Sequence, residues 1–538
     1  MPKVQDERIA VESLRQKDRV AEIRRISVYL IFYSGATDTV GDFFILQKKK
    51  GKKKMQKILA DAVDKFNGYV TDYVLIFLLV GIGLFYTIKT KAVQVRCFGE
   101  GMKNVFGNIK LKGGKKEGGL SSFQALATAV AAQVGTGNII GASGAILVGG
   151  PGAIFWMWII AFLGMATIYA EAVLAQKTKV VNADGSCEGG PVYYIKTAFK
   201  GKFGKYLAGF FSVAAIIALG FVGAMVQANS IADTTATAFG ACGVTDATAQ
   251  QIIKIIVGVI VAGLAGFILF GGTKKLASAT EKIVPVMACL YLVGGILVLC
   301  VNIVNVPKAI GMIFKFAFVP QAILGGAFGA GIKAAISQGA KRGLFSNEAG
   351  MGSTPHAHAL ADVKDPHTQG TSAMMGVFID TFVVLTMTAL IVISTLYCDG
   401  TITVAGAAAG VDKTNMVQLA FQKTFGVLFG KVAGDIIGAI FVAICLFFFA
   451  FSTILSWNYF GKVNFLSLFG KKSNLVYNCI AVVFVFLGAA LASNALVWNL
   501  TDMFNNLMVI PNAIALFALS ALVVSATKFG KKKDLDLK

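Results

Sequence analysis

The hexapeptide Gln133-Val134-Gly135-Thr136-Gly137-Asn138 lies in the middle of an otherwise apolar run, residues 121–148. Two glycines on either side of a threonine weaken a helix, and a break frees backbone N–H and carbonyl groups. The N–H groups of the restarting half-helix suit a carboxylate, whereas the freed carbonyls suit a desolvated cation. We therefore interpret the hexapeptide as a break in a membrane helix that forms a binding site. Close helix packing is the alternative, because Gly137 and Gly141 have the GxxxG spacing.

A second polar and glycine-rich stretch, Gly343–Ser353 (GLFSNEAGMGS), interrupts the run 323–360. Backbone of this kind is tolerated at membrane depth only inside protein or against a water-filled cavity. The stretch therefore predicts a second broken helix. Lys341 and Arg342 directly precede it, so they either line a watery vestibule or indicate that the break lies a turn away.

The composition is that of a membrane protein. Of 538 residues, 56% are hydrophobic and 14% are charged, whereas a soluble domain is about 25% charged. A helix needs about 20 apolar residues to cross the hydrocarbon core of a bilayer. The runs of sufficient length are 69–88, 121–148, 152–176, 206–231, 252–271, 283–304, 323–360 (interrupted), 373–396, 433–459, 474–492 and 504–527.

The number of these runs predicts an internal symmetry. One leading span leaves ten, which divide into two halves of five, and halves with an odd number of spans insert in opposite orientations. The two breaks then lie in the first helix of each half. We predict an all-α polytopic membrane protein of about 11 transmembrane helices, with a five-plus-five inverted repeat and one extra N-terminal helix.

The chain is predicted to consist of six segments. The basic extension has the sequence Lys-Gly-Lys-Lys-Lys directly before Met55, as a translated ribosome-binding site would, so Met55 is a candidate start and a disordered basic tail is the alternative. The segments are the extension 1–54, a leading helix with a basic loop at 55–120, the first repeat 121–304, a connection 305–322, the second repeat 323–527 and a basic tail 528–538.

The loop charges predict an orientation. Alternate loops, beginning with 89–119, hold 26 Lys and Arg, whereas the opposite set holds 5. Because positive loops stay in the cytoplasm, we expect the mature N-terminus outside and the C-terminus in the cytoplasm. The net charge of +22 is explained by these loops, and nucleic-acid binding is not expected.

Other side chains exclude several classes of site. The eight cysteines are scattered, without a CxxC pair, and predict neither a metal site nor a disulfide framework. His356 and His358 are two residues apart, so they point to different sides of a helix. No catalytic or nucleotide-binding motif is present, so an enzyme is not expected.

Polar residues inside the spans are candidates for function by default. Glu171 and Asp380 lie near the predicted cytoplasmic ends of the third and eighth spans, away from the expected midplane. We expect them to hold helices together as hydrogen-bond acceptors. Gln227, Thr453 and Trp457 lie deep enough to line a central pocket, although a Trp at the interfacial belt is the commoner case.

Three motifs resemble the alanine or glycine:cation symporter family. They are Gly135–Asn138 (GTGN), Gly149–Trp158 (GGPGAIFWMW) and Gly343–His358 (GLFSNEAGMGSTPHAH), and the likeness covers about 59–530. The resemblance implies a LeuT-type fold and sodium-driven uptake of alanine or glycine across the bacterial inner membrane. No cofactor is implied, and the expected partners are the amino acid, Na⁺ and the lipid bilayer.

The same resemblance implies the site residues. It places Thr136, Gly137, Asn138, Gln227, Leu344, Asn347, Thr453 and Trp457 around the substrate. For Na⁺ it implies the carbonyls of Ala131 and Val134 with the hydroxyls of Ser452 and Thr453. A ligand set made only of oxygen suits a hard cation.

We therefore expect a secondary active transporter that imports a small zwitterion, alanine or glycine and conceivably the D-isomer, with Na⁺. A proton-coupled amino-acid permease is the alternative, because the residues alone do not distinguish Na⁺ from H⁺. An ion channel is a weaker alternative, since repeated subunits and a filter loop are not seen.

Overall fold

A computed structural model describes residues 58, 60–107, 120–182, 187–318, 328–403, 406–491 and 495–527. It divides into two compact units, residues 1–65 and residues 66–538. In the first unit only residues 58 and 60–65 are described, and they are helical. The predictions for 1–54 and 528–538 lie outside the described residues. All elements named below belong to the second unit.

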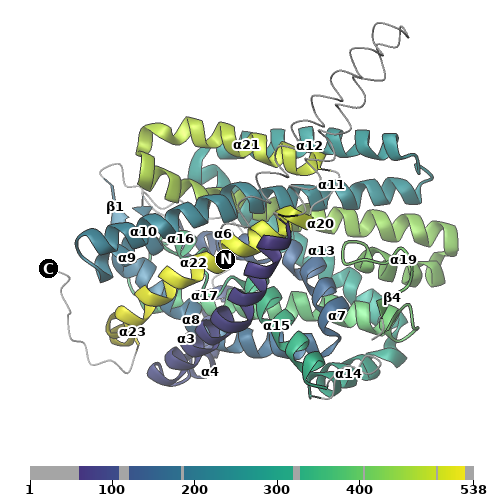
Figure 1. Ribbon diagram of the computed structural model, residues 1–538, viewed down its shortest axis with the longest axis horizontal. Helices are drawn as coiled ribbons and strands as arrows, with labels where there is room; N and C mark the ends of the chain where they lie inside the picture. The colour runs from purple at the N-terminus through teal and green to yellow at the C-terminus, as the bar shows by residue number, and fades with distance from the viewer. Residues whose placement is uncertain are drawn as a thin grey trace, which may run out of the picture. The chain divides into compact units, whose positions relative to one another are not determined.

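The part before the second break consists of helices joined by short turns and one small hairpin (Figure 1). The helices are η1 (Thr71–Leu75), α3 (Ile76–Lys89), α4 (Val93–Arg96), α5 (Phe98–Phe106), α6 (Ser122–Gln133), η2 (Gly137–Gly141), α7 (Ala142–Gly149), α8 (Gly152–Thr178), α9 (Pro191–Ala198), α10 (Lys202–Ala215), η3 (Ile216–Gly223), α11 (Ala224–Ala241), α12 (Ala247–Leu269), α13 (Gly272–Val301), η4 (Ile303–Asn305) and α14 (Val306–Phe318). The antiparallel hairpin pairs β1 (Val180–Val181) with β2 (Cys187–Glu188).

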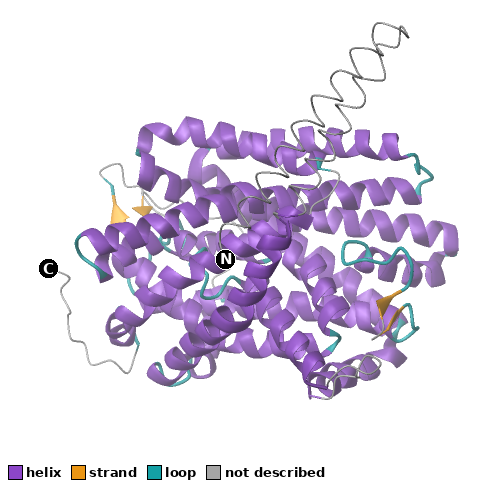
Figure 2. Cartoon of the chain, viewed as in Figure 1, coloured by secondary structure: helices purple, strands orange, loops and turns teal. Residues whose placement is uncertain are grey.

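The remaining part is built in the same way (Figure 2). Its helices are α15 (Phe328–Asn347), α16 (Pro355–His358), α17 (Pro366–Val377), η5 (Phe378–Leu385), α18 (Thr386–Val392), η6 (Ile393–Tyr397), α19 (Met416–Phe429), α20 (Lys431–Phe469), η7 (Lys471–Ser473), α21 (Asn474–Ala490), α22 (Ala495–Ala518) and α23 (Ser520–Ala526). A second antiparallel hairpin pairs β3 (Ile402–Thr403) with β4 (Gly406–Ala407).

Hydropathy finds most of the predicted spans among the described residues. Eight helices are long and apolar enough to cross a membrane, and the number rises to ten when each of two bent pairs counts as one span. One bent pair is Ser122–Gln133 with Gly137–Gly149, at 44°. The predicted span at 323–360 does not pass this test. Its place is taken by α15, which carries three cationic side chains and is too polar to be recognised by hydropathy.

Several predicted connections are helical instead of extended. The connection 305–322 contains α14, and the loop 397–432 contains α19. The loop 272–282 is the first part of α13. Hydropathy detects only the part of a helix that crosses hydrocarbon, so polar ends and helices outside the span escape it.

The first break has the position that the glycines predict. A capping box of Ser121 and Gln124 begins α6, which fixes the start of the helix. The helix ends at Gln133, and Val134 is extended with ψ 91°. A π-helical turn, η2, then restarts the chain at Gly137.

The second break lies later than predicted. Helix α15 continues through Gly343 and ends at Asn347. The irregular backbone extends over 348–354, where Glu348 has φ 58° and Gly350 has φ 88°. An added Cβ on Gly343 would make only ordinary contacts with Met157 and Ile160 of α8, at 3.7–3.9 Å. Gly343 therefore lies inside a regular helix, and the break begins about one turn after it.

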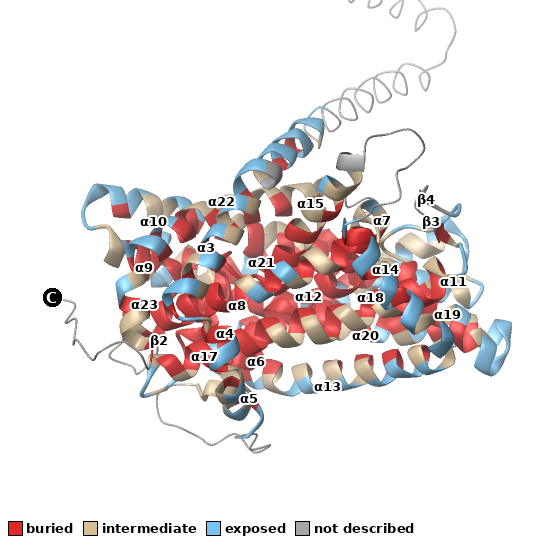
Figure 3. Ribbon diagram, turned by 90° about the horizontal axis from the view of Figure 1, so that it is seen from below, coloured by how far each residue is buried: buried red, intermediate tan, exposed pale blue. Residues whose placement is uncertain are grey.

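The repeat mates α8 and α17 pack against each other in the interior. Gly370 of α17 lies so close to Tyr169 of α8 that an added Cβ would be 2.7 Å from its ring. Figure 3 shows the buried residues running through the central helices, with the exposed ones at helix ends and outward faces. Close packing of α8 and α17 holds the two halves together behind the breaks.

Candidate functional site

The ends of the two broken helices meet directly. The Gln133 side chain, at the end of α6, donates from Nε2 to the Asn347 carbonyl at the end of α15 (2.8 Å). On the other side of the break, an added Cβ on Gly137 would be 3.0 Å from the Cα of Ser346. Gly137 therefore combines both readings of the sequence: it belongs to the break, and it allows close approach of the second half.

Asp380 joins the first break to the second. It is fully buried in η5, and its Oδ1 accepts a hydrogen bond from Asn138 Nδ2 (2.6 Å). The Ser346 hydroxyl donates to the same carboxylate (3.0 Å), as does the Thr381 hydroxyl (2.8 Å). The expected role as a helix-joining acceptor is confirmed. The expectation that Asp380 lies away from the breaks is wrong, because it contacts residues of both broken helices.

Side-chain oxygens accept hydrogen bonds from the backbone N–H groups that the first break frees. The Gly135 N–H donates to Asn138 Oδ1 (2.9 Å), and the Thr136 N–H donates to Gln227 Oε1 (3.2 Å). The Thr136 hydroxyl is fully buried and has no hydrogen-bond partner among the described residues. An unmet buried hydroxyl costs free energy. Thr136 and the two N–H groups thus form a cluster able to hold an oxygen-bearing ligand.

Oxygen atoms of α6 and α20 converge beside this cluster. The Ala131 carbonyl accepts from the Thr453 hydroxyl (3.0 Å) and from the Ser452 hydroxyl (3.4 Å). An added Cβ on Gly135 would be 2.4 Å from Thr453 Oγ1, so only glycine allows this approach. Three of the four predicted cation ligands are therefore together. Val134 follows at the end of α6, with its N–H bonded to the Val130 carbonyl, and no described contact joins its own carbonyl to the group.

Glu171 holds the second break in shape. Its carboxylate accepts the N–H of Gly350 (3.2 Å) and of Gly352 (3.0 Å). Asn512 of α22 donates to the same carboxylate (2.6 Å) and also to the Gly350 carbonyl (2.9 Å). The expected role of Glu171 as an acceptor between helices is confirmed. Its partners are residues of the second break. Glu171 therefore lies beside that break, whereas the sequence placed it away from the midplane.

Glu348 accepts from two side chains across the second break. The Ser353 hydroxyl donates to one carboxylate oxygen, and the Trp457 indole N–H donates to the other. Trp457 is 1% exposed, and its ring packs edge-on against Phe345 at 5.7 Å between centroids. An added Cβ on Gly223 would be 2.6 Å from the indole. Trp457 is therefore a buried residue of the centre, not of an interfacial belt.

The last turn of α15 supplies the remaining predicted residues. Leu344 is 2% exposed and Asn347 is 1% exposed. Asn347 Oδ1 accepts the N–H of Ala349 (3.1 Å), and its Nδ2 donates to the Thr381 hydroxyl (3.3 Å). Asn347 thus holds the first turn after its own helix and also contacts the second half.

Sequence reasoning missed the residues that connect the predicted ones. Gln133, Ser346 and Glu348 were all within the quoted stretches, but no role was assigned to them. Polar residues adjacent to a break need partners at membrane depth, and this requirement was the available signal. Their partners are distant in sequence and could not be identified from one chain.

The cations before the second break have an acidic partner. Lys341 Nζ lies 2.9 Å from Asp502 Oδ2, and Arg342 Nη2 lies 3.5 Å from the same oxygen. Asp502 is on α22 and is 3% exposed. Lys413, in the loop before α19, lies over the Trp498 ring at 4.5 Å. The second reading of this pair is confirmed, because the break is displaced by a turn. The cations pair with Asp502 beside it, and the watery vestibule stays a prediction.

A second group of potential ligands lies away from the breaks. Cys97, Glu100 and His367 place one donor atom each within 4.8 Å of one another. Tyr169 hydrogen-bonds to His367 Nδ1 (2.7 Å), which leaves Nε2 directed at Glu100 Oε2 (3.5 Å). The cysteine spacing gave no indication of this group, because His367 is distant in sequence. All eight cysteines are free thiols.

The chain is similar to transport proteins along most of its length. The Methanococcus maripaludis protein named sodium/alanine symporter AgcS is 40% identical over 87% of this chain and 96% of its own. The Bacillus subtilis protein named putative sodium/proton-dependent alanine carrier protein YrbD is 39% identical over 89% of this chain and 94% of its own.

Similarity to a solved structure concerns the fold. The crystal structure of MhsT in complex with L-phenylalanine matches with a TM-score of 0.55 and 15% identity, and covers 77% of this chain and 97% of MhsT. The predicted fold, a LeuT-type all-α membrane protein, is confirmed. The chain is a multi-pass membrane protein. Residues 55–536 match the family described as the sodium:alanine symporter family, and the chain therefore belongs to this family.

Proposed function

We propose that this chain imports a small neutral amino acid, alanine or glycine, by symport with Na⁺. The observation that carries the proposal is the contact between two neighbouring groups of atoms at the first break. One is the oxygen group of Ala131, Ser452 and Thr453, and the other contains Thr136, whose buried hydroxyl lacks a partner. Gly135 lies between them: an added Cβ on it would be 2.4 Å from Thr453 Oγ1 and 3.4 Å from Gln227 Oε1.

In this proposal the cation uses the oxygen group. Na⁺ takes the Ala131 carbonyl and the hydroxyls of Ser452 and Thr453, with the Val134 carbonyl as a fourth ligand. Oxygen ligands suit a hard cation. The ion fixes the end of α6 against α20, and this places the freed N–H groups of the break for substrate. Binding of one ligand then favours binding of the other, which is the coupling.

The amino acid uses the break itself. Its carboxylate displaces the oxygens of Asn138 and Gln227 from the N–H groups of Gly135 and Thr136, and the Thr136 hydroxyl donates to it. The released Asn138 and Gln227 oxygens, with Asn347, are then available to the ammonium. Each charge of the zwitterion needs a partner once it leaves water. Gly137 leaves room for the ligand beside Ser346.

The side chain of the amino acid faces apolar groups. Leu344 and Trp457 limit its size in this proposal. A pocket that rejects by steric conflict discriminates strongly against larger side chains, whereas one methylene more or less changes binding by only about 1–3 kcal/mol. Leucine is therefore excluded, whereas alanine and glycine are separated weakly.

Proton coupling is the second candidate, and the buried carboxyls favour it. Asp380 and Glu348 are fully buried and lie on the two breaks. A carboxyl in such a place is able to take up a proton. YrbD, whose name mentions both sodium and protons, is a relative at 39% identity.

One experiment separates these candidates. The purified chain is reconstituted into proteoliposomes, and uptake of labelled L-alanine is measured under an imposed Na⁺ gradient, an H⁺ gradient or a K⁺ gradient. Uptake above the K⁺ control under Na⁺ alone supports the proposal. Uptake driven equally by the H⁺ gradient without Na⁺ contradicts it, and ion flux without alanine indicates a channel.

We further propose the bacterial inner membrane as the location, with the mature N-terminus outside and the C-terminus in the cytoplasm. The excess of Lys and Arg in alternate loops supports this orientation. Labelling of single cysteines introduced at 245 and 472 by an impermeant reagent tests it. The residue at 245 should react in intact cells, and the one at 472 should react only after lysis.

A further inference from the structure

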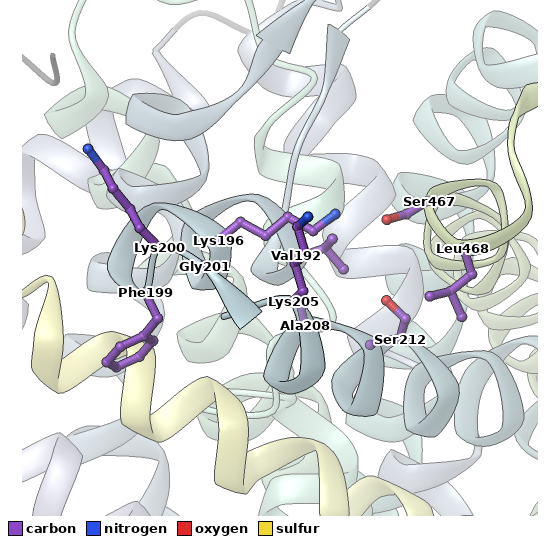
Figure 4. A pocket seen from close by; sticks show the side chains of 11 residues that line it. Val192, Lys196, Phe199, Lys200, Gly201, Lys205, Ala208, Ser212, Ser467 and Leu468 are labelled. Carbon is purple, nitrogen blue, oxygen red and sulfur yellow. The ribbon is translucent and has the colours of Figure 1, made fainter. Parts of the chain in front are cut away.

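A basic cavity lies apart from the breaks, between α9, α10 and the end of α20 (Figure 4). Its volume is about 450 Å³, which is within the range of small-molecule sites. Its lining includes three lysines, two serines and two glycines: Lys196, Lys200, Lys205, Ser212, Ser467, Gly201 and Gly209.

The cavity lies where two membrane spans end. The span Lys202–Ala241 begins beside it, and the span Lys431–Phe469 ends beside it. On the outward side of α10, Phe203 is 57% exposed and Tyr206 is 76% exposed. Exposed aromatic rings next to lysines are typical of the headgroup level of a bilayer. The cavity is therefore at the depth of lipid phosphates.

The charge of the cavity is positive. Figure 4 shows the ammonium groups of Lys196 and Lys205 close together, whereas the Lys200 side chain extends away from them. Among the described residues no carboxylate pairs with Lys196 or Lys205. The N-terminus of α10 adds to this field, because Gly201 precedes it with φ 84° and no side chain caps its N–H groups.

A buried hydroxyl indicates that the cavity holds a ligand. Ser212 is 1% exposed, and its hydroxyl has no hydrogen-bond partner among the described residues. Figure 4 shows this oxygen and that of Ser467 directed toward the cavity. A buried hydroxyl without a partner is costly, so a ligand with acceptor oxygens would relieve it.

We propose that this cavity binds the phosphate headgroup of an anionic phospholipid. Lys196, Lys205 and the first N–H groups of α10 hold the phosphate oxygens, and the two serine hydroxyls hold the polar end of the headgroup. Apolar side chains of Val192, Ala208 and Leu468 complete the lining and suit the start of the acyl chains. Basic pockets between membrane helices bind anionic headgroups elsewhere. The inference does not depend on the transported substrate.

Native mass spectrometry of the full chain in detergent tests the proposal. Phosphatidylglycerol, phosphatidylethanolamine and inorganic phosphate are titrated separately, and bound adducts are counted. We expect phosphatidylglycerol to bind best. The double variant Lys196→Gln/Lys205→Gln should weaken it at least about tenfold, because two cations are lost. The matched control Lys274→Gln/Lys282→Gln removes the same charge from exposed positions of α13 outside the lining and should change it less than threefold.

A second pair of variants blocks the space without changing charge. A Cβ added at Gly209 meets nothing within 4 Å, so Gly209→Leu should fill the cavity, leave the chain folded and weaken phosphatidylglycerol binding at least about tenfold. Gly263→Leu, at an open helix position on α12, is its control and should have no effect.

Three results would overturn the proposal. Equal losses in the Lys196/Lys205 pair and in the Lys274/Lys282 pair would show that only general surface charge attracts lipid. Unchanged binding in Gly209→Leu, with an unchanged melting temperature, would place the lipid elsewhere. Inorganic phosphate that binds as tightly as phosphatidylglycerol, with the same dependence on Lys196 and Lys205, would make the cavity a site for free phosphate.

Discussion

Ser452 and Thr453 are neighbours on α20 and share the Ala131 carbonyl, but their geometry differs. Thr453 Oγ1 is 3.0 Å from that carbonyl, whereas Ser452 Oγ is 3.4 Å away, and both hydroxyls also lie within donating distance of the Phe449 carbonyl (3.0 and 2.9 Å). Thr453 also lies directly against Gly135, where an added Cβ would be 2.4 Å from Thr453 Oγ1. A substitution of Thr453 would therefore disturb the break. Ser452 is therefore the cleaner position at which to test the cation site.

Ser452→Ala should raise the Na⁺ concentration for half-maximal alanine uptake about tenfold. A polar contact with a charged group contributes roughly 1.5–3 kcal/mol, and 1.4 kcal/mol corresponds to tenfold. The measurement is uptake in proteoliposomes at varied Na⁺. Ser372→Ala is a matched control, because the buried Ser372 hydroxyl donates to the Thr368 carbonyl of its own helix, α17 (2.9 Å). An unchanged Na⁺ dependence in Ser452→Ala removes this residue from the cation site.

Trp457 requires two variants, because its ring and its indole N–H make separate contacts. Trp457→Ala should admit valine or leucine and weaken alanine, since the size limit is removed. Trp457→Phe removes the indole N–H that donates to Glu348 but keeps most of the ring. Because the ring sets the size limit, leucine should still be excluded. Competition of labelled alanine by unlabelled leucine measures both. If leucine competes equally poorly in Trp457→Ala and in the parent, another residue limits the pocket.

Asn347→Ala should abolish alanine binding, as expected if the residue contacts the substrate. The contacts of its amide with Ala349 and Thr381 add a structural effect, and loss of a typical hydrogen bond costs about 1 kcal/mol. We therefore expect a lower melting temperature by a few degrees together with loss of binding. Near-normal apparent affinity for alanine in this variant would contradict its place in the site.

The role of a residue was predictable from the sequence where only glycine leaves room for a neighbouring segment. Gly135 and Gly137 stand out in an apolar run, and both lie at close contacts between halves. Asp380 was noticed as a buried carboxylate, but its partners Asn138 and Ser346 come from two other elements. A sequence indicates that a buried acid needs partners; it does not say which distant residues they are.

At the scale of elements, the two breaks are built differently. The first is a sharp interruption between α6 and η2, and its N–H groups donate to Gln227 of α11 and to Asn138 of η2 itself. The second is a longer loop around Gly350, whose N–H groups point to Glu171. The glycine pattern predicted both breaks. It misplaced the second because α15 continues through Gly343 to Asn347, and a glycine inside a helix has the same appearance in sequence as a helix-breaking one.

Glu171→Gln should loosen the second break. The amide has one acceptor oxygen, so at least one of the N–H groups of Gly350, Gly352 and Asn512 loses its partner. A buried donor left unpaired costs about 1–3 kcal/mol. We expect a lower melting temperature and weaker alanine uptake. Glu281→Gln, which changes one part-buried hydrogen bond with Gln124, should leave both unchanged; equal effects in the two variants would contradict a specific role for Glu171.

At the scale of the whole described part, the polar cluster beside the second break joins three distant segments. Lys341 and Arg342 come from α15, Asp502 from α22 and Lys413 from the loop before α19. Of the elements that carry these residues, hydropathy recognises α22 as part of a span, but it recognises neither α15 nor the loop before α19. The cluster depends on how spans pack, and this information is absent from a run of apolar residues.

Lys413 gives this cluster a dependence on pH. Burial lowers its pKa to about 8, and the nearby cations Arg342 and Lys341 act in the same direction. A lysine whose pKa is lower in the folded state disfavours folding while it is protonated. Between pH 8 and the ordinary lysine pKa of about 10.4, the unfolded chain binds more protons than the folded one, so this group makes the folded state more stable as pH rises.

Lys413→Met should therefore stabilise the protein near pH 7 and remove this dependence. Melting temperatures of the parent and the variant, measured from pH 7 to pH 10, should differ most at pH 7 and converge as pH rises. Lys423→Met is the control, because Lys423 forms an exposed pair with Asp399 and exposed pairs contribute about 0–1 kcal/mol. Lys423→Met should leave the change of melting temperature with pH the same as in the parent. Parallel curves for the parent and Lys413→Met over the whole range would mean that the Lys413 ammonium is not held against Arg342 and Lys341 in the folded protein.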